Sequence, residues 1–325
     1  MAARAYDEQE DVDTFLDEVE TKVLHISESR LSEKTFHIKE AVCGALSNIE
    51  KLYERKGETS GLATGFADLD KMTDGLHAAE MIVVAARPSM GKTAFAMNIA
   101  EHVALTGGHA VAIFSLEMST EQLVQRLLCS RAKVNMSKVR DGFMTDRDFN
   151  NLTAAAALIA ESKIHIDDTA GLSILELRAK ARRMKAQHDI QLIVIDYLQL
   201  LKSTSKRGQE NRQIEISEIS KGIKELNIPI VVLAQLNRNP EARVGGKPRL
   251  SDLRESGSIG QDADLVGLLV RYEYYADTDE DKANTAGEAE LIIAKQRNGP
   301  VGEVLLTFQK EFTRFGNRAK KSPEE

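Results

Sequence analysis

Tryptophan is missing from this chain of 325 residues, and aromatic residues make up only 5% of it. We therefore expect a hydrophobic core built mainly from aliphatic side chains. Cysteine is also scarce, since only Cys43 and Cys129 are present, far apart and without a metal-binding spacing. This argues against a disulfide framework and predicts two reduced thiols in a cytoplasmic protein.

Long apolar runs are absent as well. No stretch approaches the roughly 20 apolar residues needed to cross a bilayer, and the opening MAARAYDEQEDVDTF turns acidic at once, unlike a secretory signal. Positive charge is in deficit, because the net charge is −7. This excludes a surface that is basic all over but allows a few local contacts with nucleic-acid phosphates.

Two amphipathic helical patterns come first, over 11–28 and 36–56, followed by the turn residues of GETSGLATG. We place a domain boundary at this turn. The expected parts are a helical linker over 1–57, a main domain over 58–318 and a polar tail over 319–325. The apolar face of the first helix could pack on its own domain or meet another subunit, and the pattern leaves both interpretations open.

From Thr59 onward, short aliphatic runs alternate with helical patterns. The expected strands are 81–86, 110–115, 163–167, 191–196, 228–234, 263–271, 289–295 and 303–308. The expected helices are 92–105, 119–131, 145–160, 173–188 and 212–226. This alternation predicts an α/β fold, with a mostly parallel sheet covered by helices on both faces. The last three strands have no long helices between them, so we expect an appended, antiparallel portion.

The stretch AARPSMGKTAF joins the first expected strand to the first expected helix of this domain. It ends like the phosphate-binding loop G-x-x-x-x-G-K-[ST], although Ala86 stands where the first glycine is usual. In such a loop, Lys92 neutralises the β- and γ-phosphates and Thr93 binds Mg²⁺, while backbone N–H groups surround the phosphates. The residues expected to bind the nucleotide are Ser89, Met90, Gly91, Lys92, Thr93 and Ala94.

Three more expected strands end in, or run directly into, a polar residue. Glu117 follows the strand 110–115, where it could act as a general base on water or as an acid at a helix N-terminus. Asp196 ends an apolar run and could serve Mg²⁺ or form a turn. Gln235 could report the γ-phosphate to the loop that follows. Since open α/β sheets bind ligands at the carboxyl edge of their strands, we favour catalysis for the set.

Two further motifs have open interpretations. In IIAKQRNGP, Lys295 and Arg297 should share one face of a strand, either as solvated cations at an edge or as groups offered to a neighbour's nucleotide. In PRLSDLRESGSIGQDAD, Arg254 and nearby N–H groups could contact nucleic-acid phosphates. The composition of this second stretch alone favours a plain loop–helix connection.

Taken together, these stretches resemble the C-terminal motor domain of the DnaB-type bacterial replicative DNA helicases, a RecA-like ATPase. The resemblance covers nearly the whole chain. Its motifs, in order, are TGFADLDKMTDGL, ARPSMGKTAFAMNIA, FSLEMS, IDYLQL, QLNR, LRESGSI, QDAD and AKQRNGP. The phosphate loop of this family commonly lacks the first glycine, so Ala86 does not count against nucleotide binding.

The resemblance implies an ATP-driven, hexameric motor that moves 5′ to 3′ on single-stranded DNA and unwinds duplex at the replication fork. It implies Mg·ATP bound by Lys92 and Thr93, with Asp196 serving the metal. The other implied roles are water activation by Glu117, γ-phosphate sensing by Gln235, a phosphate-facing Arg126, contacts in trans by Lys295 and Arg297, and DNA contacts by Arg254, Glu255 and Gly257. Implied partners are a helicase loader and primase, with no membrane.

The chain also departs from the family pattern. It starts near the family's linker, so we expect the helical N-terminal domain to be absent and the helix 11–28 to dock on the adjacent subunit. The helix within 212–226 is about one turn short, and Gly260 stands where a glutamate is usual. Alternatives are a RecA-like recombination or repair ATPase that forms filaments on DNA, and an assembly protein gated by nucleotide without unwinding.

Overall fold

The computed structural model describes residues 59–196, 226–237, 247–256, 260, 262–275 and 278–318, with isolated positions between 38 and 53. The chain divides into two compact units, Met1–Glu58 and Thr59–Glu325. The predicted helix 11–28 and nearly all of the predicted helix 212–226 lie outside the described residues.

In the first unit, the described positions are helical, as the pattern of 36–56 predicts. They include a stripe of large apolar side chains at helical spacing, all of them exposed to solvent: Ile38, Val42, Leu46, Ile49 and Tyr53. A face of this kind is suited to contact with another surface.

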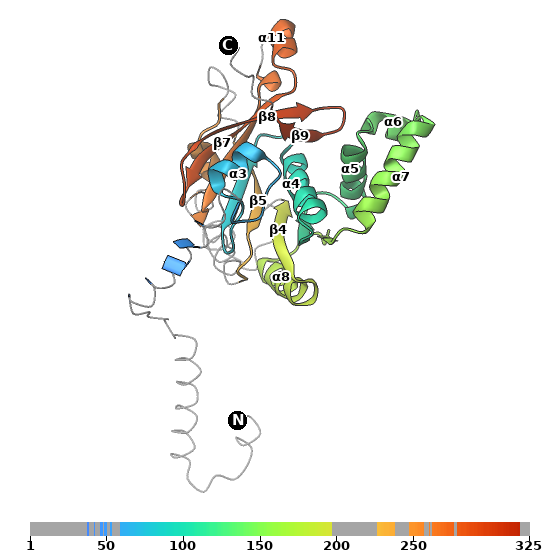
Figure 1. Ribbon diagram of the computed structural model, residues 1–325. Coiled ribbons are helices and arrows are strands. Elements are labelled where there is room, and N and C mark those ends of the chain that lie inside the picture. Colours follow the sequence, from blue (N-terminus) through green and yellow to red (C-terminus); the bar gives the residue numbers. More distant parts are fainter. Residues whose placement is uncertain are drawn as a thin grey trace, which may run out of the picture. The chain divides into compact units, whose positions relative to one another are not determined.

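One nine-stranded sheet organises the second unit (Figure 1). Its strands are β1 (Met81–Ala86), β2 (Ala110–Ser115), β3 (Ile164–Asp167), β4 (Ile190–Asp196), β5 (Ile230–Gln235), β6 (Leu265–Arg271), β7 (Glu288–Gln296), β8 (Gly302–Gln309) and β9 (Arg314–Asn317). The order across the sheet is β3-β2-β4-β5-β1-β6-β7-β8-β9. Strands β1 to β6 pair in parallel and β6 to β9 antiparallel. The predicted fold and its antiparallel extension are both confirmed.

The central strands are buried on both faces, which is why they read as continuous aliphatic runs. Val84 of β1 packs with Phe95 and Ile99 in one core cluster. Val83, its neighbour in sequence, packs with Leu177 in the other cluster on the opposite face. Each fully buried aliphatic or aromatic side chain of this kind contributes about 1.5–3 kcal/mol relative to exposure.

The helices are α3 (Ala67–Thr73), α4 (Lys92–Glu101), α5 (Thr120–Ala132), α6 (Met136–Asp141), α7 (Asp146–Ala160), α8 (Ile174–His188) and α11 (Asp279–Asn284), and α4 continues as a π-helix over His102–Thr106. Helices α4 and α5 pack in the core cluster on one face of the sheet and α8 in the cluster on the other face, while α7 packs on α5 (Figure 1). Ser119, Thr145 and Ser173 cap the longer helices α5, α7 and α8 with reciprocal capping boxes. These caps explain why three of the predicted helices begin within one residue of the expected position.

The structure adds elements that hydrophobic periodicity misses. Strand β9 pairs with β8, although its four residues are too few for a periodic signal. Helix α11 lies in the stretch 277–288, which the acidic composition predicts to be a loop. The hydroxyl of Thr278 accepts from the backbone N–H of Asp281 and so starts this short helix. Among the described residues, no helix is long and apolar enough to span a bilayer.

Glu290, on β7, is a carboxylic acid inside the antiparallel part of the sheet, and only 2% of it is exposed. Its side chain accepts a hydrogen bond from the hydroxyl of Tyr272. Burial, and then the hydrogen bond and charge of Glu303 nearby, raise the pKa of Glu290 from 4.5 to about 7.

Stability should therefore depend on pH through Glu290. Between pH 4.5 and about pH 7, the folded protein retains a proton that the unfolded chain releases, so this group lowers the free energy of unfolding as pH rises. Glu290→Gln removes that dependence. We expect the free energy of urea unfolding, taken as variant minus parent, to increase from pH 5 to pH 7 and then to level off. A difference independent of pH would contradict the assigned ionisation.

Candidate nucleotide and DNA site

The carboxyl ends of five adjacent parallel strands carry the candidate site. In the order across the sheet, Glu117 follows β2, Asp196 ends β4, Gln235 ends β5, the phosphate loop follows β1 and Arg271 ends β6. Ser115 pairs with Asp196, and Ala86 pairs with Gln235. This is the edge at which open α/β sheets bind their ligands.

The phosphate loop turns sharply between β1 and α4. Gly91 is the N-cap of α4 and has a φ of 91°, in the left-handed region that favours glycine. A Cβ at this position would lie 3.0 Å from the ring of Phe315. Both facts explain why the motif requires this glycine, whereas Ala86, which is paired at the end of β1, needs no special conformation.

Lys92 and Thr93 form the first turn of α4 and converge on Asp196. The hydroxyl of Thr93 donates to Asp196 Oδ2 at 2.6 Å, and Lys92 Nζ lies 3.8 Å from Asp196 Oδ1. Burial lowers the pKa of the Lys92 ammonium, while the charges of Asp196 and Glu117 oppose this shift. The two carboxylates therefore offset part of the cost of burying this ammonium group.

The same group of atoms fits a Mg²⁺ ion. Asp196 is 2% exposed, and its Oδ1 atom is buried without a hydrogen-bond partner. A hydroxyl oxygen and a carboxylate oxygen are hard ligands that Mg²⁺ accepts beside substrate phosphates. Among the described residues, no cluster of three or more His, Cys, Asp or Glu side chains forms a separate metal site.

A tight turn holds Glu117 over the site. The Ser115 hydroxyl donates to the carbonyl of Met118 at 2.6 Å, and the backbone N–H of Leu116 donates to the carbonyl of Asp196 at 2.7 Å. Glu117 itself is exposed and lines the cleft. An accessible carboxylate beside Lys92 is what water activation requires, and that role stays a prediction.

Gln235 also faces the cleft, and its strand is tied to the phosphate loop. The backbone N–H of Leu236 donates to the carbonyl of Ala86 at 3.0 Å, and Arg87 Nη1 donates to the carbonyl of Leu236 at 3.1 Å. A displacement of the phosphate loop would thus reach the segment after Gln235 directly.

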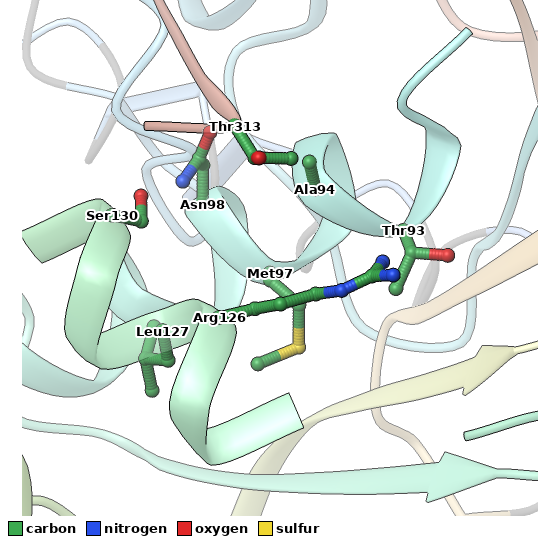
Figure 2. Close-up of a pocket in the computed structure, with 8 residues that line it drawn as sticks. All are labelled: Thr93, Ala94, Met97, Asn98, Arg126, Leu127, Ser130 and Thr313. Atoms are coloured by element: carbon green, nitrogen blue, oxygen red, sulfur yellow. The ribbon is translucent and has the colours of Figure 1, made fainter. Parts of the chain in front are cut away.

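These residues surround a cleft of about 760 Å³, a size suited to a nucleotide. Ser89, Gly91, Lys92, Thr93, Ala94, Glu117, Arg126 and Gln235 all line it. Figure 2 shows Arg126 extending from α5 towards Thr93, beside a smaller adjoining pocket. Met90 is the exception among the predicted loop residues: its side chain is 4% exposed and packs in the core.

Arg271 also lines the cleft, although it was not among the predicted site residues. Its Nη1 donates to the carbonyl of Ser89 at 3.2 Å, and its guanidinium lies 3.8 Å from the ring centroid of Phe308. Burial lowers the pKa of Arg271. The sequence did contain a signal for this residue: Arg271 ends the apolar run 263–271, just as polar residues end the other strands.

Lys295 and Arg297 lie apart from the cleft of their own chain. Lys295 Nζ donates to the carbonyls of Gly260 and Ala263, at 3.0 and 2.8 Å, and Arg297 Nη1 pairs with Asp264 at 3.1 Å. Arg297 is nevertheless 46% exposed. Contact with a neighbour's nucleotide stays a prediction for both residues.

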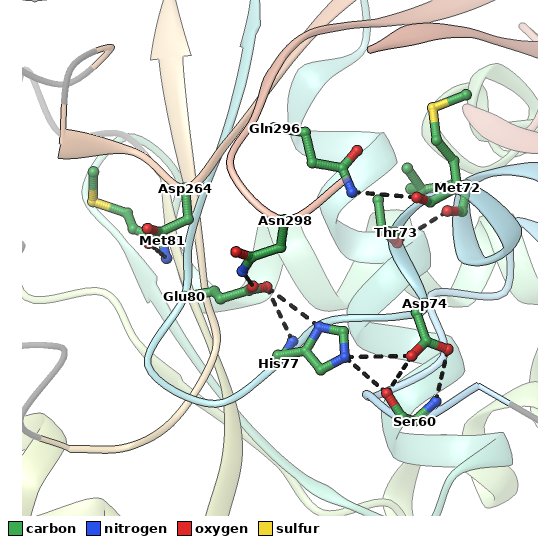
Figure 3. A network of polar contacts seen from close by, with 11 residues as sticks. Ser60, Met72, Thr73, Asp74, His77, Glu80, Met81, Asp264, Gln296 and Asn298 are labelled. Carbon is green, nitrogen blue, oxygen red and sulfur yellow. Dashed lines mark hydrogen bonds and ion pairs between the residues drawn. The ribbon is translucent and has the colours of Figure 1, made fainter. Parts of the chain in front are cut away.

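The turn around Arg297 is anchored on both sides (Figure 3). Gln296 Nε2 donates to the carbonyl of Met72 at 3.2 Å, and Asn298 Nδ2 donates to Glu80 Oε1 at 2.9 Å. Glu80 also accepts from the backbone N–H of His77. The guanidinium of Arg297 is thus presented from a backbone with little freedom to move.

The predicted DNA segment is only partly described. Arg254 and Glu255 lie in the 3₁₀-helix Leu250–Ser256, although their side chains are not among those described, and Gly257 lies outside the described residues. The helix is tied to β5, because the backbone N–H of Asn237 donates to the carbonyl of Asp252 at 3.2 Å. The DNA contacts remain a prediction.

A phosphate loop, an acid beside it and an aspartate suited to a metal ion, all at the carboxyl edge of a largely parallel sheet, are the features of a RecA-like P-loop ATPase. The model of the DnaB-like helicase C terminal domain family matches residues 61–317. The chain belongs to this family.

Relatives of known function agree with this assignment. The replicative DNA helicase DnaB of Geobacillus stearothermophilus is 45% identical over 328 residues, which cover 100% of this chain and 71% of that protein. The replicative DNA helicase DnaC of Bacillus subtilis (strain 168) is 45% identical, over 98% of this chain and 70% of its own length.

A solved structure of a DnaB-like replicative helicase, described with its interactions with primase, superposes with a TM-score of 0.79 and 35% identity. The match covers 95% of this chain and 74% of that one. The chain is therefore an ATP-hydrolysing replicative DNA helicase motor that binds nucleotide, and the filament-forming and assembly alternatives are not favoured.

Proposed function

We propose that this chain is one subunit of a hexameric ring that hydrolyses Mg·ATP between subunits and translocates on single-stranded DNA, 5′ to 3′, to separate the duplex. The observation that carries the proposal is the convergence of Lys92, Thr93 and Asp196 beside an accessible Glu117.

In this proposal, the phosphates of ATP lie over the N-terminus of α4, where backbone N–H groups and Lys92 offset their charge. Thr93 and Asp196 would hold Mg²⁺, which when bound would offset the negative charge of the phosphates. Arg126 adds a second cation to the phosphates. Glu117 orients a water molecule and accepts its proton as the water oxygen bonds to the γ-phosphorus, and the bond from that phosphorus to the bridging oxygen breaks to leave ADP.

Gln235 then senses the loss of the γ-phosphate. Because Asn237, two residues further on, binds the carbonyl of Asp252, the change reaches the 3₁₀-helix that carries Arg254 and Glu255. We assign to these two residues and Gly257 the contacts with the DNA backbone. Phosphate contacts confined to one segment agree with a net charge of −7.

Subunit contacts complete the site. Arg297, half exposed on its anchored turn, reaches the nucleotide of the adjacent subunit. The exposed stripe from Ile38 to Tyr53 offers an apolar surface for ring assembly. A primase and a loader are proposed partners; a solved relative is described with its primase interactions.

A paired measurement tests the proposal. ATP hydrolysis with and without oligo(dT) is compared, and the mass with a non-hydrolysable ATP analogue is determined by light scattering. We expect DNA to stimulate hydrolysis, a mass of about six times 35.9 kDa, and strand displacement on a forked duplex with a 5′ tail. An equal rate of ATP hydrolysis with and without DNA, together with no strand displacement, would refute the motor function for this chain.

A further inference from the structure

A three-residue cluster joins the start of the candidate DNA segment to the antiparallel part of the sheet. Lys247 Nζ donates to Glu303 Oε1 at 2.8 Å and lies 3.6 Å from Glu290 Oε1. Glu290 is on β7 and Glu303 is on β8, so one ammonium group connects two strands. We call Lys247, Glu290 and Glu303 the Lys247 clamp.

The clamp combines a buried acid with an exposed one. Glu290 is 2% exposed, whereas Glu303 and Lys247 are about half exposed. The hydrogen bond from Lys247 lowers the pKa of Glu303, and the same contact raises the pKa of Lys247. The Lys247–Glu303 pair is therefore charged at neutral pH, and its hydrogen bond is charge-assisted.

Lys247 stands at one end of a short segment that is fixed at two points. Pro248 is buried, and the backbone N–H of Arg249 donates to Asp252 Oδ2 at 2.7 Å. Asp252 is bound in turn by Asn237 from the end of β5, and Leu253 is 3% exposed. The clamp thus holds one end of this segment and β5 holds the other, directly before Arg254.

We infer that Lys247 and Glu303 are positioning residues for DNA binding: their ion pair fixes the segment 247–253, and thereby orients the DNA-contacting residues that follow it. The inference rests on the proposed function, namely that the residues from Arg254 to Gly257 contact single-stranded DNA. Glu290 lies beside the pair, close to Lys247, and it accepts a hydrogen bond from the hydroxyl of Tyr272.

A competing account makes opposite predictions. Half-exposed Lys247 could bind a DNA phosphate itself, with Glu303 merely competing for it. In that case, removing the charge of Glu303 frees Lys247, reduces repulsion and tightens DNA binding. If the clamp positions the segment, the same substitution weakens DNA binding although it makes the protein less negative.

The test is the affinity of the Glu303→Gln variant of this chain for fluorescent oligo(dT), measured by anisotropy with a non-hydrolysable ATP analogue over a range of salt concentrations. We expect the Kd to rise about tenfold, since one charge-assisted hydrogen bond is weakened. The slope of log K against log salt should stay unchanged, because no phosphate contact is lost. Glu161→Gln, which removes the same charge at an exposed site just after α7, serves as the matched control and should bind no more weakly than the parent.

A second variant guards against misfolding. Lys247→Met should weaken DNA binding to a similar extent, and Lys247→Arg should restore most of the affinity. Hydrolysis without DNA should stay within about twofold of the parent in every case. Equal or tighter DNA binding by Glu303→Gln, or a salt slope reduced by one unit in Lys247→Met, would overturn the inference. Failure of the parent protein to bind oligo(dT) would instead refute the proposed function, and this inference with it.

Discussion

Lys92→Ala is expected to abolish ATP turnover, with kcat falling at least about 100-fold, the loss typical when one preorganised charge is removed from a transition state. Lys92 is largely buried, and its Nζ lies 3.8 Å from Asp196 Oδ1. Alanine at this position therefore removes the positive charge that faces both Asp196 and the γ-phosphate. Steady-state phosphate release, with and without oligo(dT), measures the effect.

Lys71→Ala is the matched control, because Lys71 is exposed on α3 and the same charge is removed. It should hydrolyse ATP at the parent rate. Binding of a fluorescent ATP analogue separates affinity from chemistry in the Lys92 variant. Turnover within about tenfold of the parent would show that Lys92 does not neutralise the transferred phosphoryl group.

Arg297→Ala is the second variant with a large expected effect. An arginine supplied in trans contributes about 10³–10⁵ to the rate of phosphoryl transfer, so we expect a loss of this order in kcat. Nucleotide affinity of a single subunit should be unchanged, because Arg297 does not line the cleft of its own chain. Asp264, its partner here, still accepts from the backbone N–H of Met81, which limits structural damage.

Mixing experiments test the action in trans. A ring assembled from Lys92→Ala and Arg297→Ala subunits contains some interfaces at which both residues are intact, so mixed rings should recover part of the activity that each variant lacks alone. Arg183→Ala, on the exposed face of α8, is the control and should behave as the parent. Intact turnover in Arg297→Ala, or no recovery on mixing, would contradict the role.

Most of the sheet could be predicted because its signal is local. Both faces of the central parallel strands are buried, so strands such as β1 and β4 are largely continuous aliphatic runs bounded by turn residues. The helices α5, α7 and α8 carry their own capping residues, which set their starts within a few positions of sequence. Short elements such as β9 and α6 contain too few residues for a periodic pattern.

The placement of the polar side chains at the candidate site could be predicted for the same reason, whereas their chemical roles stay predictions. Glu117, Asp196 and Gln235 each follow an apolar run, and parallel strands bring their carboxyl ends to one edge whatever their order in the sheet. That rule also applied to Arg271, but a terminal arginine alone does not reveal that it will hold the carbonyl of Ser89.

The amino-acid sequence was sufficient for the fold class, the family and most of the residues that line the candidate cleft, because all of these depend on short motifs and on burial repeated along the chain. Only the tertiary structure decided which distant residues contact and hold one another. Lys247 reaches Glu303 across 56 positions, and Arg271 reaches Ser89 across 182. Such contacts depend on strand order and on the direction of each side chain, and a local pattern carries neither.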